Sequence, residues 1–216
     1  MKIIVTGGTG LVGAEVIRQA IIDNDIQEVT AIVRKPLEIE HPKVKTIIHT
    51  NYSDYSTLTE VFKQNDAFLW CLGISQSQVS KEEYNAITYD YTIAAAKAMQ
   101  QTNPAATFLF VSGMGADSTE KSRTLFARVK GKTENELKRL GLKNLYIVRP
   151  GGIKPIHKNK NTAFTNKIMI PFFPLLKLLM PSGVITSVEL AKVMLHIVKK
   201  GTELKLLENI DLKNLL

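Results

Sequence analysis

The chain has 216 residues, 44% of them apolar and 22% charged, and a formal net charge of +8. These values match one soluble domain with a substantial core. The basic residues are scattered and form no run interleaved with aromatic side chains, so we exclude a nucleic-acid partner. The single cysteine, Cys71, excludes an intramolecular disulfide and offers no metal framework, so we expect a cytoplasmic protein without a bound metal.

Short apolar runs alternate along the chain with segments of helical periodicity. We expect strands over residues 2–6, 28–34, 43–49, 66–73, 106–112 and 144–151. We expect helices over about 12–21, 57–64, 80–98 and 122–140, and a last helix from Thr186. Strands that are apolar on both faces and alternate with helices indicate an α/β fold, a Rossmann-like doubly wound parallel sheet. Such sheets bind ligands beyond the carboxyl ends of their strands.

Several helix ends carry recognisable signals. Thr57 with Glu60, and Ser80 with Glu83, have the spacing of a capping box. Gly141 follows the helix predicted over 122–140 and is a usual helix terminator.

The chain divides into a predicted dinucleotide-binding core, residues 1–151, and a C-terminal substrate region, residues 152–216, packed on the same domain. Residues 152–186 have no regular pattern. The apolar stretch 168–181 is too short to span a bilayer, and prolines interrupt it, so we expect no membrane span. We expect a helical lid at 163–181, and a surface for a protein partner is the alternative. The strand-like run at 2–6 has no signal peptide before it.

The loop between the first strand and the first helix reads "VTGGTGLVG", residues 5–13. Its glycines repeat as G-x-x-G-x-x-G, in the strand–loop–helix context that a dinucleotide-binding motif requires. Bare backbone at the positive end of a helix suits a diphosphate. The residues expected to surround that diphosphate are Gly7, Thr9, Gly10, Leu11, Val12 and Gly13.

This loop, with "CLG" at 71–73, "VSGMGA" at 111–116 and "VRPGG" at 148–152, resembles the short-chain dehydrogenase/reductase superfamily. The resemblance is greatest to its atypical branch of NmrA-like and TIP30-like NAD(P)-binding proteins, which includes the biliverdin reductase B type of flavin reductase. It covers about residues 1–200 and implies a Rossmann fold and a nicotinamide dinucleotide. The branch mixes reductases with redox-sensing regulators, so the resemblance leaves the reaction open.

Arg34 and Lys35 end the second predicted strand, where an NAD site usually has an acidic residue that binds the ribose 2′-hydroxyl. Two cations there favour a 2′-phosphate, so we expect NADP(H) to be preferred over NAD(H). Asn51 falls near the place where the resemblance implies an aspartate facing the adenine. Asn51 fits the role of a turn residue equally well.

Other cofactor contacts follow from the same resemblance. Leu72 and Gly73 would let the backbone pass the adenosine ribose, while Cys71 reads as a packed thiol. Pro150 and Gly151 would shape the loop beside the nicotinamide.

The segment "FARVK", residues 126–130, puts Phe126 and Lys130 on one face of a helix. The resemblance implies Y-x-x-x-K here, with the tyrosine as the acid, the lysine on the nicotinamide ribose and a serine that orients the substrate. Ser112 and Lys130 hold the serine and lysine places, but Phe126 replaces the tyrosine. Tyr89 is a candidate substitute acid.

A positioned general acid is typically worth ~10²–10⁴ in rate, so ordinary carbonyl reduction should be slow. Three interpretations remain open. Hydride passes from NADPH to a small-molecule acceptor such as a flavin or quinone that needs no side-chain acid, another hydroxyl replaces the tyrosine for a carbonyl, or the protein senses NADP(H) without turnover. A nucleotide-sugar epimerase is a weaker alternative, because it usually needs the tyrosine and a larger C-terminal domain.

Overall fold

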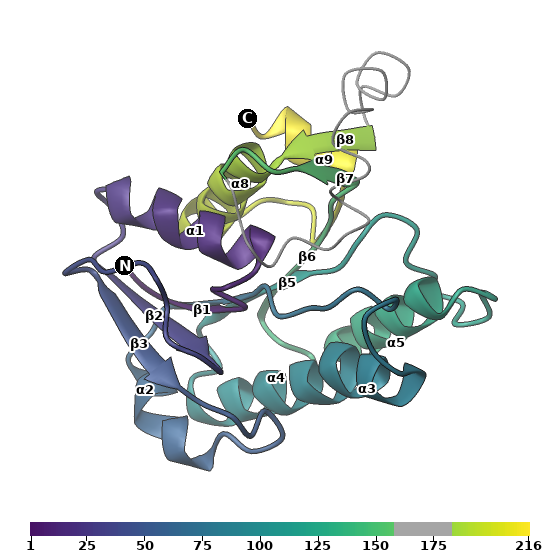
Figure 1. The fold of residues 1–216 in the computed structure, drawn as a ribbon, viewed down its shortest axis with the longest axis horizontal. Coiled ribbons are helices and arrows are strands. Elements are labelled where there is room, and N and C mark those ends of the chain that lie inside the picture. Colours follow the sequence, from purple (N-terminus) through teal and green to yellow (C-terminus); the bar gives the residue numbers. More distant parts are fainter. Residues whose placement is uncertain (158–182) are drawn as a thin grey trace.

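The computed structural model describes residues 1–157 and 183–216. These residues form an α/β sandwich around one seven-stranded sheet of strand order β3-β2-β1-β4-β5-β6-β9 (Figure 1). All adjacent pairs are parallel. The strands are β1 (Lys2–Thr6), β2 (Glu28–Val33), β3 (Val44–Ile48), β4 (Ala67–Trp70), β5 (Thr107–Val111), β6 (Asn144–Arg149) and β9 (Leu206–Glu208). The doubly wound parallel sheet expected from the sequence is therefore confirmed.

Helices cover both faces of the sheet. The described helices are α1 (Leu11–Ile22), α2 (Thr59–Lys63), α3 (Lys81–Asn85), α4 (Tyr91–Thr102), α5 (Leu125–Arg139), α8 (Ser187–Lys200) and α9 (Asn209–Asn214). A 3-10 turn, Ser56–Leu58, precedes α2, and a π-helical turn, Ala86–Asp90, joins α3 to α4. Helices α1 and α8 lie on one side of the sheet, and α2, α4 and α5 lie on the other (Figure 1).

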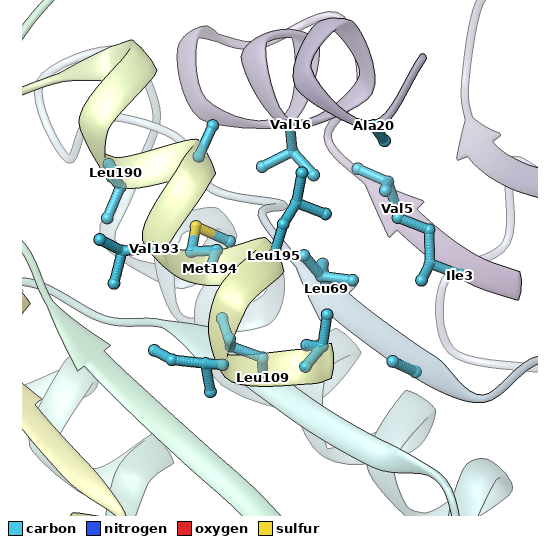
Figure 2. Close-up of a cluster of buried hydrophobic side chains, with 14 of the residues drawn as sticks. Ile3, Val5, Val16, Ala20, Leu69, Leu109, Leu190, Val193, Met194 and Leu195 are labelled. Atoms are coloured by element: carbon cyan, nitrogen blue, oxygen red, sulfur yellow. The ribbon is translucent and has the colours of Figure 1, made fainter. Parts of the chain in front are cut away.

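The core has two layers because alternate residues of each strand point to opposite faces. On the α1 and α8 side, Leu69 and Leu109 of the strands pack with Val16, Met194 and Leu195 of the helices (Figure 2). The other layer is aromatic. Its rings include Tyr52, Tyr55, Phe62, Phe68, Trp70, Phe108 and Phe110.

The expected helix ends are partly confirmed. Ser80 caps α3 by accepting the Glu83 N–H at 3.1 Å, and Gly141 ends α5 with φ of +67°. The capping box expected at Thr57 is wrong. Thr57 lies inside the 3-10 turn that precedes α2, and α2 has no side-chain cap, because the turn already supplies its first residues.

The C-terminal part is more regular than its sequence indicated. Strands β7 (Gly152–Lys154) and β8 (Val184–Thr186) pair in parallel within the segment expected to be irregular. Strand β9 adds to the edge of the main sheet beside β6. The expected lid, 163–181, lies outside the described residues. Within 1–157 and 183–216, no helix is long and apolar enough to cross a bilayer.

Candidate functional site

The strand order reverses between β1 and β4, and the glycine loop lies at this point. Gly7 has φ of +65°, and a Cβ there would lie 2.5 Å from the Cys71 carbonyl oxygen. A Cβ at Gly13 would run into the Gly7 carbonyl. The Gly10 N–H donates to the Gly7 carbonyl at 2.8 Å and closes the turn. The loop is therefore a tight backbone cradle, because side chains at Gly7 and Gly13 would collide with backbone atoms.

Helix α1 opens from this cradle. Its N-cap is Gly10, no side chain caps it, and its first turn has no acidic residue. Leu11 and Val12 are half-buried at its start, and Thr9 is exposed beside it. Uncapped N–H groups at a positive helix end suit a diphosphate, so the residues fit the dinucleotide that the motif predicts.

The end of β4 is joined to the same loop. Thr6 is buried, and its Oγ1 accepts the Leu72 N–H at 3.2 Å. Gly73 is exposed, and a Cβ there would meet nothing within 4 Å. Burial raises the pKa of the Cys71 thiol, which agrees with a packed side chain at the strand end.

The region after β2 is positively charged. Arg34 and Lys35 are both exposed and directly follow the last residue of the strand. Asn51 is also exposed, and its Oδ1 accepts the Ser53 N–H at 3.2 Å, as in an Asx turn. The oxygen expected to face an adenine amino group therefore already has a partner.

Phe126 lies against the loop that follows β5. Its Cζ would be 2.7 Å from a Cβ at Gly113, so the ring edge abuts the Gly113 backbone. The Phe126 N–H donates to Gln76 Oε1 at 2.9 Å, which fixes the start of α5 to the loop after β4. The structure thus brings the ring to the end of β5.

Lys130 is buried one turn further along α5, with 7% of its surface exposed. Its Nζ donates to the Val111 carbonyl at 2.9 Å and lies 4.7 Å from the centre of the Phe110 ring. Burial lowers the pKa of Lys130 to about 8, and Glu134 opposes this shift.

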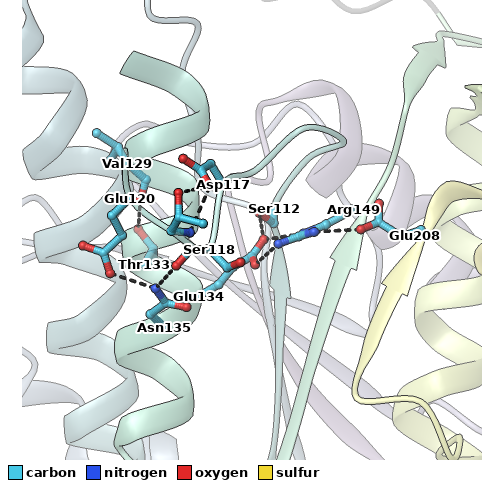
Figure 3. Close-up of polar contacts among 11 residues, drawn as sticks. Ser112, Asp117, Ser118, Glu120, Val129, Thr133, Glu134, Asn135, Arg149 and Glu208 are labelled. Carbon is cyan, nitrogen blue, oxygen red and sulfur yellow. Dashed lines mark hydrogen bonds and ion pairs between the residues drawn. The ribbon is translucent and has the colours of Figure 1, made fainter. Parts of the chain in front are cut away.

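The Ser112 hydroxyl points to a buried ion-pair chain (Figure 3). Its Oγ donates to Glu134 Oε1 at 2.5 Å, and Glu134 is fully buried. Arg149 donates to both Glu134 oxygens, at 2.9 and 2.5 Å, and to Glu208 at 2.7 Å. These hydrogen bonds, that with Glu134 first, raise the pKa of Arg149. The chain connects β5, α5, β6 and the C-terminal edge.

Tyr89 is placed away from this group. It lies in the π-helical turn, with the Nζ of Lys132 3.9 Å from its ring centre. Lys132 and Lys130 are two residues apart on α5 and project from nearly opposite sides. Burial, followed by the charge of Glu136, raises the pKa of Tyr89. The structure therefore does not bring Tyr89 together with Ser112 and Lys130.

The loop after β6 joins the loop after β5, since the Pro150 carbonyl accepts the Met114 N–H at 2.9 Å. Gly151 donates its N–H to Asn209 Oδ1 at 2.8 Å, and a Cβ there would run into the Gly183 carbonyl. Gly151 is thus required for packing on the C-terminal region.

Two buried carboxylates were missed from the sequence. Glu134 has a faint signal, because it lies four residues after Lys130 on the same helix face. Glu15 on α1 is 1% exposed and lies 2.8 Å from His157 Nδ1, yet nothing in the sequence pairs residues so far apart. Among residues 1–157 and 183–216, no three His, Cys, Asp or Glu side chains are grouped to hold a metal ion.

The fold and the glycine cradle define a dinucleotide-binding protein of the Rossmann class. Residues 7–200 match the NAD(P)H-binding family, and the chain belongs to this family. The NAD(P)-binding protein that the resemblance implied is therefore confirmed.

Two curated relatives are similar along most of their length. Protein FMP52, mitochondrial, from Debaryomyces hansenii is 28% identical over 91% of this chain and 87% of its own. Leucinostatins biosynthesis cluster protein T from Purpureocillium lilacinum is 31% identical over 92% of this chain and 85% of its own. The expected cytoplasmic location is wrong, since FMP52 relatives from several yeasts are named as mitochondrial.

Solved structures agree on the fold. A short chain dehydrogenase family protein from Francisella tularensis superposes with a TM-score of 0.68 and 15% identity, covering 97% of this chain and 98% of its own. The Bordetella bronchiseptica enzyme WbmF in complex with NAD+ gives a TM-score of 0.71 and 12% identity, covering 99% and 76%. At these identities the likeness concerns the fold alone.

Proposed function

We propose that this protein is an NADPH-dependent reductase that passes hydride to a small-molecule acceptor needing no side-chain acid. The observation that carries the proposal is that Phe126 lies on the face of α5 that also holds Lys130, with its ring on the Gly113 backbone at the end of β5. The glycine loop that would bind the cofactor is present, whereas the Phe126 ring, which stands where the acid is expected, has no proton to donate.

Bound NADPH supplies a hydride, and the acceptor gains its second hydrogen as a proton from water. Isoalloxazines and quinones accept electrons in this way, and the cofactor then carries most of the chemistry. Carbonyl compounds depend on a positioned acid, whose loss typically costs ~10²–10⁴ in rate. The proposed acceptor is therefore a flavin or a quinone, and a carbonyl compound is disfavoured.

We infer a preference for NADP(H) from Arg34 and Lys35, which are exposed directly after β2. A guanidinium can bind a 2′-phosphate bidentately, which NAD(H) lacks. Calorimetric titration of Arg34→Ala should show NADPH binding weakened about tenfold, with NADH binding unchanged. Arg139→Ala, an exposed arginine at the end of α5, serves as the matched control. Equal affinities for NADPH and NADH in the parent protein would contradict the preference.

A sensor of NADP(H) without turnover is the second candidate. It is favoured by the absence of a proton donor at Phe126 and by the Ser112 hydroxyl, which is engaged by Glu134. NADPH oxidation should be followed with riboflavin, menadione and benzaldehyde in turn. Turnover with riboflavin or menadione supports the reductase, and tight NADPH binding without oxidation by any of them supports the sensor.

We infer that the chain works in the same compartment as its mitochondrial relatives. Organelle fractionation with a tagged chain tests this, and recovery in the soluble cytoplasmic fraction would contradict it. A protein partner at 163–181 stays a prediction outside the described residues.

A further inference from the structure

The surface at the end of β5 is apolar where the site needs a wall for its acceptor. Phe126 is half-buried with its ring edge on the Gly113 backbone. Met114, the next residue of that loop, keeps 48% of its surface exposed. We call Gly113, Met114 and Phe126 the apolar wall.

Neighbouring polar groups are engaged elsewhere. A serine hydroxyl has one proton, and that of Ser112 is donated to the buried Glu134 carboxylate. The same carboxylate accepts two hydrogen bonds from Arg149, which hold it in place as the acceptor of the Ser112 proton, so Ser112 has no proton left for a hydride acceptor. The Lys130 ammonium donates to the Val111 carbonyl and is almost wholly buried. Thus the Ser112 hydroxyl offers no free donor beside the apolar wall, and the Lys130 ammonium is held against the backbone of β5.

Backbone hydrogen bonds hold the wall in place from three directions. The Met114 N–H donates to the Pro150 carbonyl, and the Phe126 N–H donates to Gln76. The Asp117 N–H donates to the Ala127 carbonyl at 2.9 Å, and Gly131 lets α5 press against the Asp117 backbone. The ring edge of Phe126 is thus held in a fixed position, while the thioether of Met114 can adjust. Together they form an apolar surface before an acceptor binds.

We propose that Phe126 is a specificity-determining residue and that the apolar wall selects a flat aromatic hydride acceptor over an aliphatic carbonyl compound. This inference rests on the proposed function. Aromatic rings gain from contact with a second ring beyond the area they bury. An aliphatic aldehyde gains no such contact, and the Ser112 proton that would serve its oxygen is already donated to Glu134. Phe126 thus selects an acceptor by contact between rings and not by donating a proton.

The test measures binding, so that it does not depend on turnover. NADP+ is titrated first, without acceptor, into the parent protein and each variant. The NADP+-loaded protein is then titrated with riboflavin, followed by fluorescence quenching, and with cyclohexanecarboxaldehyde, followed by calorimetry. Phe126→Leu removes the ring, and Phe126→Trp keeps a ring. Leu204→Ala is the matched control for Met114→Ala, because Leu204 is 49% exposed and lies outside the site.

Phe126→Leu should weaken riboflavin binding about three- to tenfold and leave NADP+ and aldehyde binding unchanged. Phe126→Trp should keep riboflavin binding within about threefold of the parent protein, and Met114→Ala should weaken it where Leu204→Ala does not. Parent-like riboflavin affinity in Phe126→Leu would overturn the inference, and so would an equal loss of NADP+ affinity. Absence of NADP+ binding by the parent protein would instead overturn the proposed function.

Discussion

Lys130 is a charged side chain at a place that water hardly reaches. It is 7% exposed, and burial lowers its pKa to about 8. Taking an ammonium out of water is costly unless it is well paired, and Lys130 donates to one carbonyl oxygen and lies over the face of Phe110. Residues that cost stability in this way are common at functional sites.

We therefore expect Lys130→Met to raise stability and weaken cofactor binding together. Methionine has similar length and no charge, so the urea midpoint at pH 7 should rise, by on the order of 1–3 kcal/mol in free energy of unfolding. NADPH affinity, measured by calorimetry, should fall about tenfold. A variant that is less stable than the parent protein would show that Lys130 supports the fold and does not strain it.

The same substitution changes the pH dependence of stability. The pKa of Lys130 is about 8 in the folded protein and about 10.5 in the unfolded chain, so the unfolded chain binds more protons between these values. Unfolding free energy of the parent protein should thus rise with pH, relative to Lys130→Met, from about pH 8 to 10.5. Parallel curves for the two proteins over this range would contradict the lowered pKa.

Two glycines near the site should respond oppositely to the same change. Gly7→Ala forces a left-handed φ of +65° on alanine and places its Cβ against the Cys71 carbonyl. NADP(H) binding should be lost, with a thermal midpoint lower by several degrees. Gly73→Ala, where a Cβ meets nothing within 4 Å, should keep the thermal midpoint of the parent protein. Thermal shift with and without NADPH gives both results, and equal behaviour of the variants would refute the cradle.

At the scale of elements, an ion pair with a buried carboxylate holds α5 against the sheet. Glu134 is fully buried on its inner face, and Arg149 of β6 contacts both of its oxygens (Figure 3). Glu208, at the N-cap of α9, binds the same arginine. The helix that carries Phe126 and Lys130 is therefore tied to the C-terminal strand through one side chain.

Arg149→Met should destabilise the protein by about 3–5 kcal/mol, because it leaves the Glu134 carboxylate buried without its cation. Glu134→Leu combined with Arg149→Met should recover most of that loss, since apolar groups often replace a buried ion pair at little cost. Urea unfolding of the single and double variants measures this. A double variant no more stable than Arg149→Met would show that the ion pair is needed for more than neutralisation.

At the scale of the whole molecule, the C-terminus completes the sheet. Leu207 of β9 and Leu212 of α9 are both fully buried, and β9 pairs with β6 from Ile147 to Arg149. Without them β6 would be an open edge, and open edges promote aggregation.

Deletion of residues 206–216 should therefore abolish soluble, cooperatively folding protein. Each buried leucine contributes about 1.5–3 kcal/mol, which is a large part of the ~5–15 kcal/mol of a typical domain. Deletion of Leu216 alone, which is 59% exposed, should change little. Solubility and thermal unfolding by circular dichroism compare the two, and a stable product of the longer deletion would refute the structural role of β9.

The sequence predicted the six core strands and the glycine loop because both have local signals, apolar runs and fixed glycine spacing. It did not predict β7, β8 or β9, since three-residue strands carry no periodicity. It did not predict the Ser112–Glu134–Arg149–Glu208 chain, because partners so far apart meet only after folding. The sequence shows Phe126 as a departure from a family pattern, whereas its contact with Gly113 depends on how α5 packs against the loop after β5.

Strands β7 and β8 run in parallel, so the chain that leaves β7 has to return to the level where β7 began. The backbones of Gly151 and Gly183 meet at this level, and a Cβ at Gly151 would collide with the Gly183 carbonyl oxygen. Steric exclusion at Gly151 is thus a condition for the two-stranded ribbon of β7 and β8, and any larger side chain there would force the two strands apart.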